Sequence, residues 1–289
     1  MAANNFKPFA TGAGANVLSQ ADWESLTALA TGFTSGKASS AQVNKALRQA
    51  TTIAAIVAQF ISDQNAADVL DNGDMNALQA QLKSALTAYT PGRFLGVKTF
   101  TSSGTYTPTA GAKKIRVRAW GGGGGGGGVS AAATAGAAGG SSGAYVEGIF
   151  SVTGPLAVSI GAGGAAGTST GGNGGAAGST SLGSLFSATG GFGGGGTTNN
   201  QAGATTSSAG TATGGNVLNL NGSSGRAPNN SLGGSGGSAF STQGGEGHYS
   251  SGSGAGGFPG SAGGGANGVA VAVTGGAGAS GYLIIEEYA

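Results

Sequence analysis

The stretch AWGGGGGGGG, residues 119–128, places eight consecutive glycines directly after a predicted strand. Ordering the backbone of one residue costs roughly 1–2 kcal/mol, so eight glycines cost on the order of 10 kcal/mol. The run has no side chains to bury and no charge to solvate. It is therefore either a flexible linker or a segment that specific interactions hold in place.

Repeats elsewhere in the chain favour an ordered segment. GAGGAAG at 161–167 recurs as GNGGAAG at 172–178, and glycines lie three apart at 254, 257, 260 and 263. Three residues per turn is the period of the polyproline-II helix, whose N–H and C=O groups point outward and need partners. Only glycine lets such helices lie side by side, so we expect backbone hydrogen bonds between segments. A linker explains the eight-glycine run alone, and collagen needs far more proline than the six residues present.

The composition excludes several kinds of site. The 289-residue chain has 65 glycines, no cysteine, one histidine (His248) and a net charge of +2. These counts exclude disulfides, thiolate metal sites and Cys/His catalysis. Between residues 121 and 280 the only charged side chains are Glu147, Arg226 and Glu246, too few acids for a serine triad or a carboxylate pair. We therefore expect no enzyme activity, no cofactor and no metal.

Glycine is distributed unevenly along the chain. Residues 1–96 hold seven of the glycines, and Thr90-Pro91-Gly92 is a helix-stop signal. We therefore assign residues 1–92 to a helical region and residues 93–289 to a glycine-rich β domain. Three helices are expected in the first: one capped by Ser19 with Trp23, Leu26, Ala30 and Phe33 on one face, one over about 40–62, and one capped by Asp74. The N-terminus MAANNFKPFA lacks the pattern of a signal peptide.

The second predicted helix carries a heptad seam. Its positions are spaced 4-3-4-3-4: Val43, Leu47, Ala50, Ala54, Val57 and Ile61. A stripe this wide on so short a region needs a partner surface. Either an intramolecular bundle or self-association of several chains supplies it, and the sequence leaves both open.

The second region begins and ends with strands. Residues 114–120 alternate strictly, residues 144–152 and 156–160 flank a turn, residues 182–189 form a weaker strand, and residues 281–288 close the chain. The expected fold class is α+β. It comprises an N-terminal helical bundle or coiled coil and a C-terminal β-scaffold holding glycine-rich, partly polyglycine-II-like loops.

These patterns resemble a known family. IRVRAWGGGGGGGG, GGSSGAYVEGIFSV, VSIGAGGAAG and GASGYLIIEEY are similar to the glycine-rich C-terminal domain of bacteriophage tail-fibre and receptor-binding proteins. FKPFATGAGANVLSQADWESLTALATGF, with SGKASSAQVNKALRQATTIAAIVAQFI and DVLDNGD, resembles the attachment region of such fibres in phages of Gram-negative bacteria. The tract also resembles the adhesins of T-even-like phages, whose tips pack polyglycine-II helices in layers.

The resemblance implies a protein of the virion tail. Its N-terminal region would join the baseplate or tail as a homotrimer, and its C-terminal domain would bind a host surface receptor such as a polysaccharide, pilus or outer-membrane protein. Such proteins are made in the host cytoplasm, which fits the missing signal peptide. The alternative is a baseplate or fibre connector without host binding of its own.

Receptor contacts are expected from loop side chains on the glycine scaffold. The candidates are Phe192, Asn199, Asn200, Arg226, Asn229, Asn230, His248, Tyr249 and Phe258. For Phe186 and Phe240 we expect packing between glycine layers instead. The basic cluster of Lys113, Lys114, Arg116 and Arg118, with Arg93 and Lys98, is expected on the solvent face of a strand. It is too small for a nucleic-acid site, whereas contact with anionic lipopolysaccharide stays open.

Overall fold

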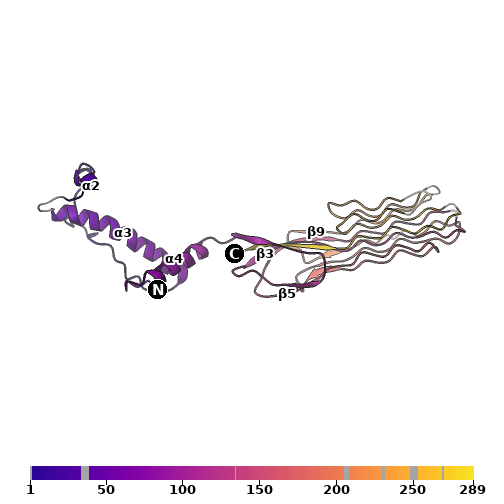
Figure 1. Ribbon diagram of the computed structural model, residues 1–289, viewed down its shortest axis with the longest axis horizontal. Helices are drawn as coiled ribbons and strands as arrows, with labels where there is room; N and C mark the ends of the chain where they lie inside the picture. Colours follow the sequence, from indigo (N-terminus) through magenta and orange to yellow (C-terminus); the bar gives the residue numbers. More distant parts are fainter. Residues whose placement is uncertain are drawn as a thin grey trace. The chain divides into compact units, whose positions relative to one another are not determined.

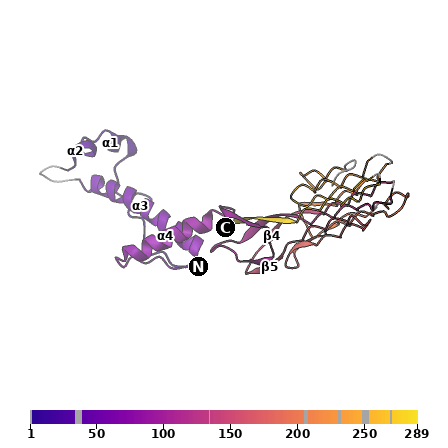
Figure 2. The same cartoon turned by 45° about the vertical axis from the view of Figure 1, so that its right-hand side comes forward.

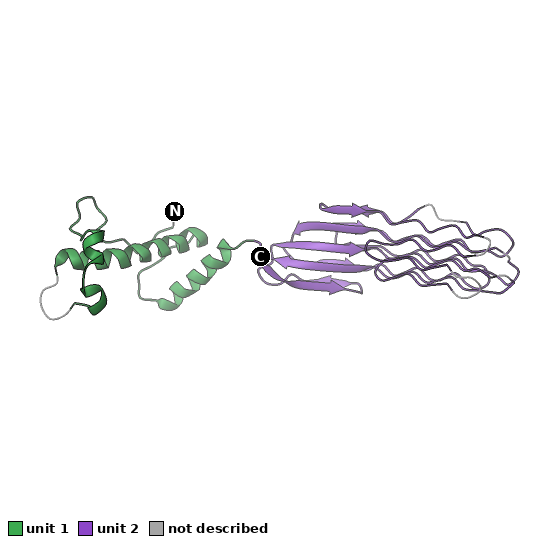
Figure 3. Cartoon of the chain, turned by 90° about the horizontal axis from the view of Figure 1, so that it is seen from above, with its two compact units in different colours: residues 1–91 green, residues 92–289 purple. Residues whose placement is uncertain are grey.

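The chain forms two compact units, Met1–Pro91 and Gly92–Ala289 (Figure 3). The computed structural model describes residues 2–33, 39–133, 135–204, 208–229, 232–247, 253–268 and 270–289. The division falls within the Thr90-Pro91-Gly92 segment. Each unit has its own core.

The first unit is a small helical part with four helices in its described residues. They are α1 (Gln20–Glu24), α2 (Ala28–Thr31), α3 (Ser40–Asn65) and α4 (Met75–Tyr89). Ser19 caps α1 by accepting from the N–H of Asp22, and Asp74 caps α4 by accepting from the N–H of Ala77. The single helix expected after Ser19 is instead two short ones, because the chain leaves the helix at Ser25.

The core of the first unit joins the ends of α3 and α4 to the N-terminal segment. Ala58, Ile61, Val69 and Ala85 are buried there, with Phe6, Phe60, Leu78 and Leu82 packed around them. Asn4 forms a bridge with Val69 beside this cluster. Of the predicted seam only Ile61 is buried; the side chains of Leu47 and Val57 are 45% and 41% exposed.

The second unit contains two antiparallel sheets of five strands each. The first has the order β1-β10-β3-β4-β9 and the second β2-β5-β6-β7-β8. Their strands are β1 (Phe94–Phe100), β2 (Gly104–Tyr106), β3 (Lys114–Trp120), β4 (Tyr145–Ser151), β5 (Leu156–Ser159), β6 (Thr180–Leu182), β7 (Ser187–Ala188), β8 (Ala212–Thr213), β9 (Leu218–Leu220) and β10 (Tyr282–Tyr288). Both termini of the unit lie at the sheets, where the N–H of Gly92 donates to the carbonyl oxygen of Ala289.

The apolar core of this unit follows the strand alternation. Ile115, Val117 and Ala119 on β3 are fully buried, and Leu283 and Ile285 of the neighbouring β10 join them. The second sheet contributes a further set to the same cluster: Tyr106, Val158, Leu182, Phe186 and Ala188. A one-residue alternation therefore sends Arg116 and Arg118 to the opposite face of the first sheet.

Beyond the strands, glycine-rich segments run side by side away from the sheets (Figures 1 and 2). We call these hydrogen-bonded glycine-rich segments the lattice. The eight-glycine stretch, residues 121–128, continues β3 into the lattice, and we call it the central run. All eight of its N–H groups donate to neighbouring segments at 2.8–3.1 Å. The acceptors repeat every third residue: Ala144, Ser141 and Ala138 for Gly121, Gly124 and Gly127; Gly178, Gly175 and Gly172 for Gly122, Gly125 and Gly128; Ala279 and Gly276 for Gly123 and Gly126.

The carbonyl groups of the central run bind three other segments with the same period. Gly122, Gly125 and Gly128 accept from Gly191, Gly194 and Thr197; Gly123 and Gly126 from Gly164 and Gly167; Gly124 and Gly127 from Gly263 and Ala266. The run is thus enclosed by six neighbouring segments, and each of its eight residues is buried. The expected hydrogen bonding between glycine segments is present, and its threefold repeat is the polyproline-II period.

The fold-class expectation is wrong in its architecture. The N-terminal part is neither a bundle nor a coiled coil, because two of its helices are single short turns and α3 packs on α4 only near its C-terminal end. The C-terminal part is not one small scaffold holding loops. It is a pair of five-stranded antiparallel sheets whose strands continue into a lattice of paired glycine segments. The chain is an α+β mixed fold with only a small helical N-terminal part.

Candidate functional site

The lattice brings several connecting segments to the end of the second unit that lies away from the sheets (Figure 1). Among them, residues 129–133 follow the central run, residues 168–171 join two paired glycine segments, and residues 197–203 join two more. We call these connections the lattice tip. Backbone pairing along every segment therefore fixes where each tip connection starts and ends.

Three of the predicted receptor residues lie at or beside the lattice tip, and all three are exposed: Asn199, Asn200 and Asn229. The Oδ1 of Asn199 accepts from the N–H of Gln201 at 2.9 Å, and the Oδ1 of Asn229 accepts from the N–H of Leu232 at 2.6 Å. Asparagine stabilises turns in this way. The amides therefore shape the connections that display them.

The other described candidates lie away from the tip. Phe192 is 47% exposed on the side of the lattice, and Arg226 is exposed on a neighbouring segment. Phe258 lies at the sheet end, 51% exposed, with its ring centroid 5.3 Å from that of Tyr282. The described members of the predicted receptor-binding set therefore do not lie on a single surface. Asn230, His248 and Tyr249 lie outside the described residues.

The two phenylalanines expected between glycine layers have different surroundings. Phe186 is buried in the core between the sheets, only 4% exposed. Phe240 stacks on Tyr145 with a centroid distance of 4.2 Å, but 44% of its side chain is exposed. Neither ring lies within the lattice, because close packing of the glycine backbones leaves no such space.

Buried serines fasten outer segments to the lattice interior, which the sequence analysis did not anticipate. The Oγ of Ser141 donates to the carbonyl of Phe192 and accepts from its N–H at 2.7 Å. The Oγ of Ser142 donates to the carbonyl of Ser238 and accepts from the N–H of Ser223. In each case the serine hydroxyl accepts from a backbone N–H of the outer segment, in place of a backbone carbonyl. Two adjacent serines inside a glycine tract were the sequence feature that could have predicted these bonds.

A small apolar cluster underlies the lattice tip. It consists of Val129, Ala133, Ala137, Ala266 and Val273. Asn267 follows directly on Ala266 and is fully buried, and neither its Oδ1 nor its Nδ2 has a hydrogen-bond partner within the described part of the chain. This amide is too enclosed to contact a receptor.

The first sheet holds the buried charges of the second unit. Glu147 accepts from the Nε of Arg116 at 2.9 Å and from the hydroxyl of Tyr145 at 2.8 Å. Arg118 pairs with Glu286 at 2.6 Å. Two members of the predicted basic cluster are thus paired with acids on the outer face of the sheet. This pairing reduces their capacity to bind polyanions.

A second buried carboxylate lies on the inner face of the first sheet. Glu287, only 1% exposed, accepts from the hydroxyl of Tyr106 at 2.8 Å and from the N–H of Thr109 at 2.9 Å, and its carboxylate lies 3.3 Å from the Nζ of Lys98. Burial alone raises the pKa of Glu287, but these hydrogen bonds outweigh it and lower the pKa below its ordinary value. Both oxygens of each carboxylate accept hydrogen bonds from neighbouring side chains or backbone, so the two carboxylates stabilise the fold.

The pKa of Glu147 follows the same balance. Burial raises it, and the hydrogen bonds from Arg116 and Tyr145 lower it by more. Burial, together with the bond to Glu147, raises the pKa of Tyr145 far above its usual range. Both groups keep their ordinary charge at neutral pH, as a structural pair does.

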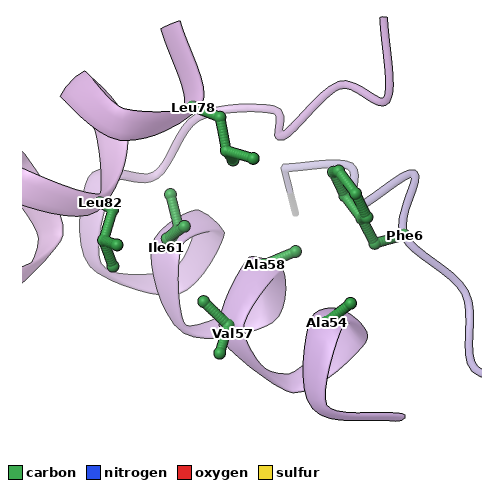
Figure 4. Close-up of a pocket in the computed structure, with 7 residues that line it drawn as sticks. All are labelled: Phe6, Ala54, Val57, Ala58, Ile61, Leu78 and Leu82. Carbon is green, nitrogen blue, oxygen red and sulfur yellow. The ribbon is translucent and has the colours of Figure 1, made fainter. Parts of the chain in front are cut away.

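The first unit has an apolar pocket between α3, α4 and the N-terminal segment (Figure 4). Its volume is about 250 Å³, and it is lined by Phe6, Ala54, Val57, Ala58, Ile61, Leu78 and Leu82. The C-terminal half of the predicted oligomerisation seam (Ala54, Val57 and Ile61) faces this pocket. Val43, Leu47 and Ala50 lie nearer the start of α3, and whether they mediate self-association stays a prediction.

The described residues contain neither a metal-binding cluster nor a membrane-spanning helix. No group of three or more His, Cys, Asp or Glu side chains in that part of the chain could hold a metal ion. Likewise, none of the described helices combines the length and apolar character needed to cross a membrane.

These features define a class of protein with two units. The larger unit is a glycine lattice that is built on a pair of antiparallel sheets and carries turn segments at its end. The chain belongs to the glycine-rich domain family, whose sequence profile matches residues 99–288, more than half of the chain. That match says nothing of phage tail fibres. A comparison with curated proteins gives no significant match.

Proposed function

We propose that this chain is a tail-fibre or receptor-binding protein that attaches a phage virion to a Gram-negative host surface. The observation that carries the proposal is the lattice, which holds several turn segments at one end through backbone hydrogen bonds. A rigid display reduces the entropy lost on binding. The resemblance of both regions to fibre sequences supports the same role.

Recognition in this proposal comes from polar tip side chains. Asn199, Asn200 and Asn229 are exposed, and amides both donate to and accept from sugar hydroxyls or peptide groups. The described acids of the sheets are paired with basic or hydroxyl groups, which supports binding without catalysis. The helical unit would join the chain to other tail proteins as a homotrimer in the virion, after synthesis in the host cytoplasm.

The test uses the full chain, fluorescently labelled, on a panel of Gram-negative strains. Binding to a strain, with competition against phage adsorption to that strain, is the expected result. Asn200→Ala should weaken binding about tenfold or more, whereas Asn76→Ala, an exposed asparagine on α4, should leave it unchanged.

Two outcomes would overturn the proposal. A chain that incorporates into virions but binds no strain is a connector. Release of sugar from purified host polysaccharide by the purified chain would make it a depolymerase.

A further inference from the structure

A second pocket in the first unit is polar and cationic. It lies between the N-terminal segment, α1 and α3, and has a volume of about 660 Å³. Its lining comprises Thr11, Gln20, Lys45, Arg48, Gln49, Thr52 and Ile53. The α3 members are spaced 3-1-3-1, so they form one face of that helix. Successive residues turn by about 100°, which places this face opposite the predicted seam.

Lys45 is buried, and no acid among the described residues forms an ion pair with its ammonium group. The residue is 4% exposed, and its Nζ donates to the Oε1 of Gln20 at 2.8 Å. An ammonium has three donors, and in the described chain this is the single acceptor found for them. The Nε2 of Gln20 in turn donates to the Oε1 of Glu24 at 2.8 Å, so the amide of Gln20 lies between the lysine and that acid.

Arg48 adds a second charge to the same pocket. In the described ranges no carboxylate lies within 4.0 Å of either cation, whereas in the other unit Arg116 is paired with two carboxylates and Arg118 with one. A buried charge is costly unless an opposite charge compensates it. The hydroxyls of Thr11 and Thr52 and the amide of Gln49 add further hydrogen-bonding groups. The site therefore suits an oxyanion.

Apolar side chains continue the same face of α3. Ile53 lines the pocket and is 63% exposed, and Ile56, which follows within one turn, is 60% exposed. A small inorganic anion would use the two cations but leave these isoleucines in water. A peptide that carries an acidic residue next to an apolar one would cover both.

We infer that this pocket binds a carboxylate from an acidic segment of a partner protein, seated on Lys45 and Arg48 with an apolar neighbour against Ile53 and Ile56. The guanidinium of Arg48 can hold a carboxylate through two parallel bonds, and the Lys45 ammonium supplies further donors. This binding is independent of any receptor contact at the lattice tip, because the pocket lies in the first unit.

The test measures binding of capped peptides to the full chain by calorimetry. The probe is a peptide with two glutamates between leucines, and its glutamine counterpart is the control. The glutamate peptide should bind at least about tenfold more tightly, because charged hydrogen bonds are the stronger ones. Arg48→Gln and Lys45→Met should each reduce that affinity about tenfold, whereas Lys83→Gln, which removes an exposed charge on α4, should not.

Arg48 is only half-buried, so the Arg48→Gln variant tests the pocket even where Lys45→Met disturbs the fold. Circular dichroism of each variant checks the helices. Equal binding of the two peptides, or unchanged binding by Arg48→Gln, would overturn the inference. Tight binding of inorganic phosphate without binding of the glutamate peptide would overturn the assignment to a protein carboxylate.

Discussion

Gly125 lies so close to the backbone of Ala165 that a Cβ on the glycine would lie 1.9 Å from the carbonyl oxygen of that alanine. The N–H of Gly125 meanwhile donates to Gly175 at 2.9 Å, and its carbonyl accepts from Gly194 at 2.8 Å. The same crowding recurs along the central run, where each Cβ would lie within 2.4 Å of a neighbouring carbonyl oxygen. Eight glycines are needed because the run has backbone neighbours on every side.

Gly125→Ala should therefore destabilise the second unit by about 3 kcal/mol or more, because the added methyl forces packed backbones apart. Gly104→Ala, on β2 with open space around it, should change stability by less than about 1 kcal/mol. Thermal and chemical unfolding of the full chain measure both. Equal stability of the two variants would mean that the central run is not enclosed.

The alternation of residues 114–120 and 281–288 predicted β3 and β10 well, because those strands bury one face. The single strand predicted over residues 182–189 is instead the end of β6 followed by β7, and β7 and β8 have only two residues each, too few to be delimited by a pattern. Their pairing follows from the lattice segments that continue them. β1 was missed because none of its residues is buried and its apolar residues do not alternate with polar ones in the sequence FLGVKTF.

The candidate site was predicted less well than the strands. Asparagines such as Asn199 were expected at receptor loops, and the structure places them at the tip, but also in turn-forming bonds that sequence cannot distinguish from recognition. Phe258 was grouped with them because sequence distance does not reveal which end of a folded-back segment a residue occupies. The heptad spacing marks an apolar face of α3, but spacing cannot say that α4 and Phe6 would cover the C-terminal half of that face.

Stability of the second unit should fall in acid. Glu147 and Glu287 have lowered pKa values in the folded state, whereas an unfolded glutamate titrates near about 4.3. The unfolded chain then binds more protons in this window, so the stabilisation is complete above about pH 4.3 and is lost as pH falls through the lower folded-state values.

Melting temperatures recorded from pH 7 down to 3 test this. Glu287→Gln should flatten the acid-side slope, and Glu246→Gln, an exposed acid of the same unit, should leave it unchanged. A melting temperature that is constant across the range would contradict the role of both carboxylates.

Replacing the orphan amide under the tip should stabilise the lattice. A buried polar group without a partner costs about 1–3 kcal/mol, and leucine has nearly the shape of asparagine. Asn267→Leu should therefore raise the free energy of unfolding by at least about 1 kcal/mol, and Asn267→Asp, which buries a charge, should lower it. If the leucine variant were the less stable one, the amide would have a partner in solution.

The proposed homotrimer predicts a role for the open part of the α3 seam. Leu47, in the half of the seam that α4 and Phe6 leave uncovered, is 45% exposed, and burying such a side chain contributes about 1.5–3 kcal/mol in each chain. Light scattering should therefore give three times the chain mass of 26.9 kDa. Leu47→Glu should reduce the mass to that of one chain, because a carboxylate cannot enter the contact unpaired, whereas Gln79→Glu, the same charge change on the exposed side of α4, should leave the trimer intact. A wild-type chain of single mass would refute self-association, and a trimer that survives Leu47→Glu would move the contact away from this face of α3.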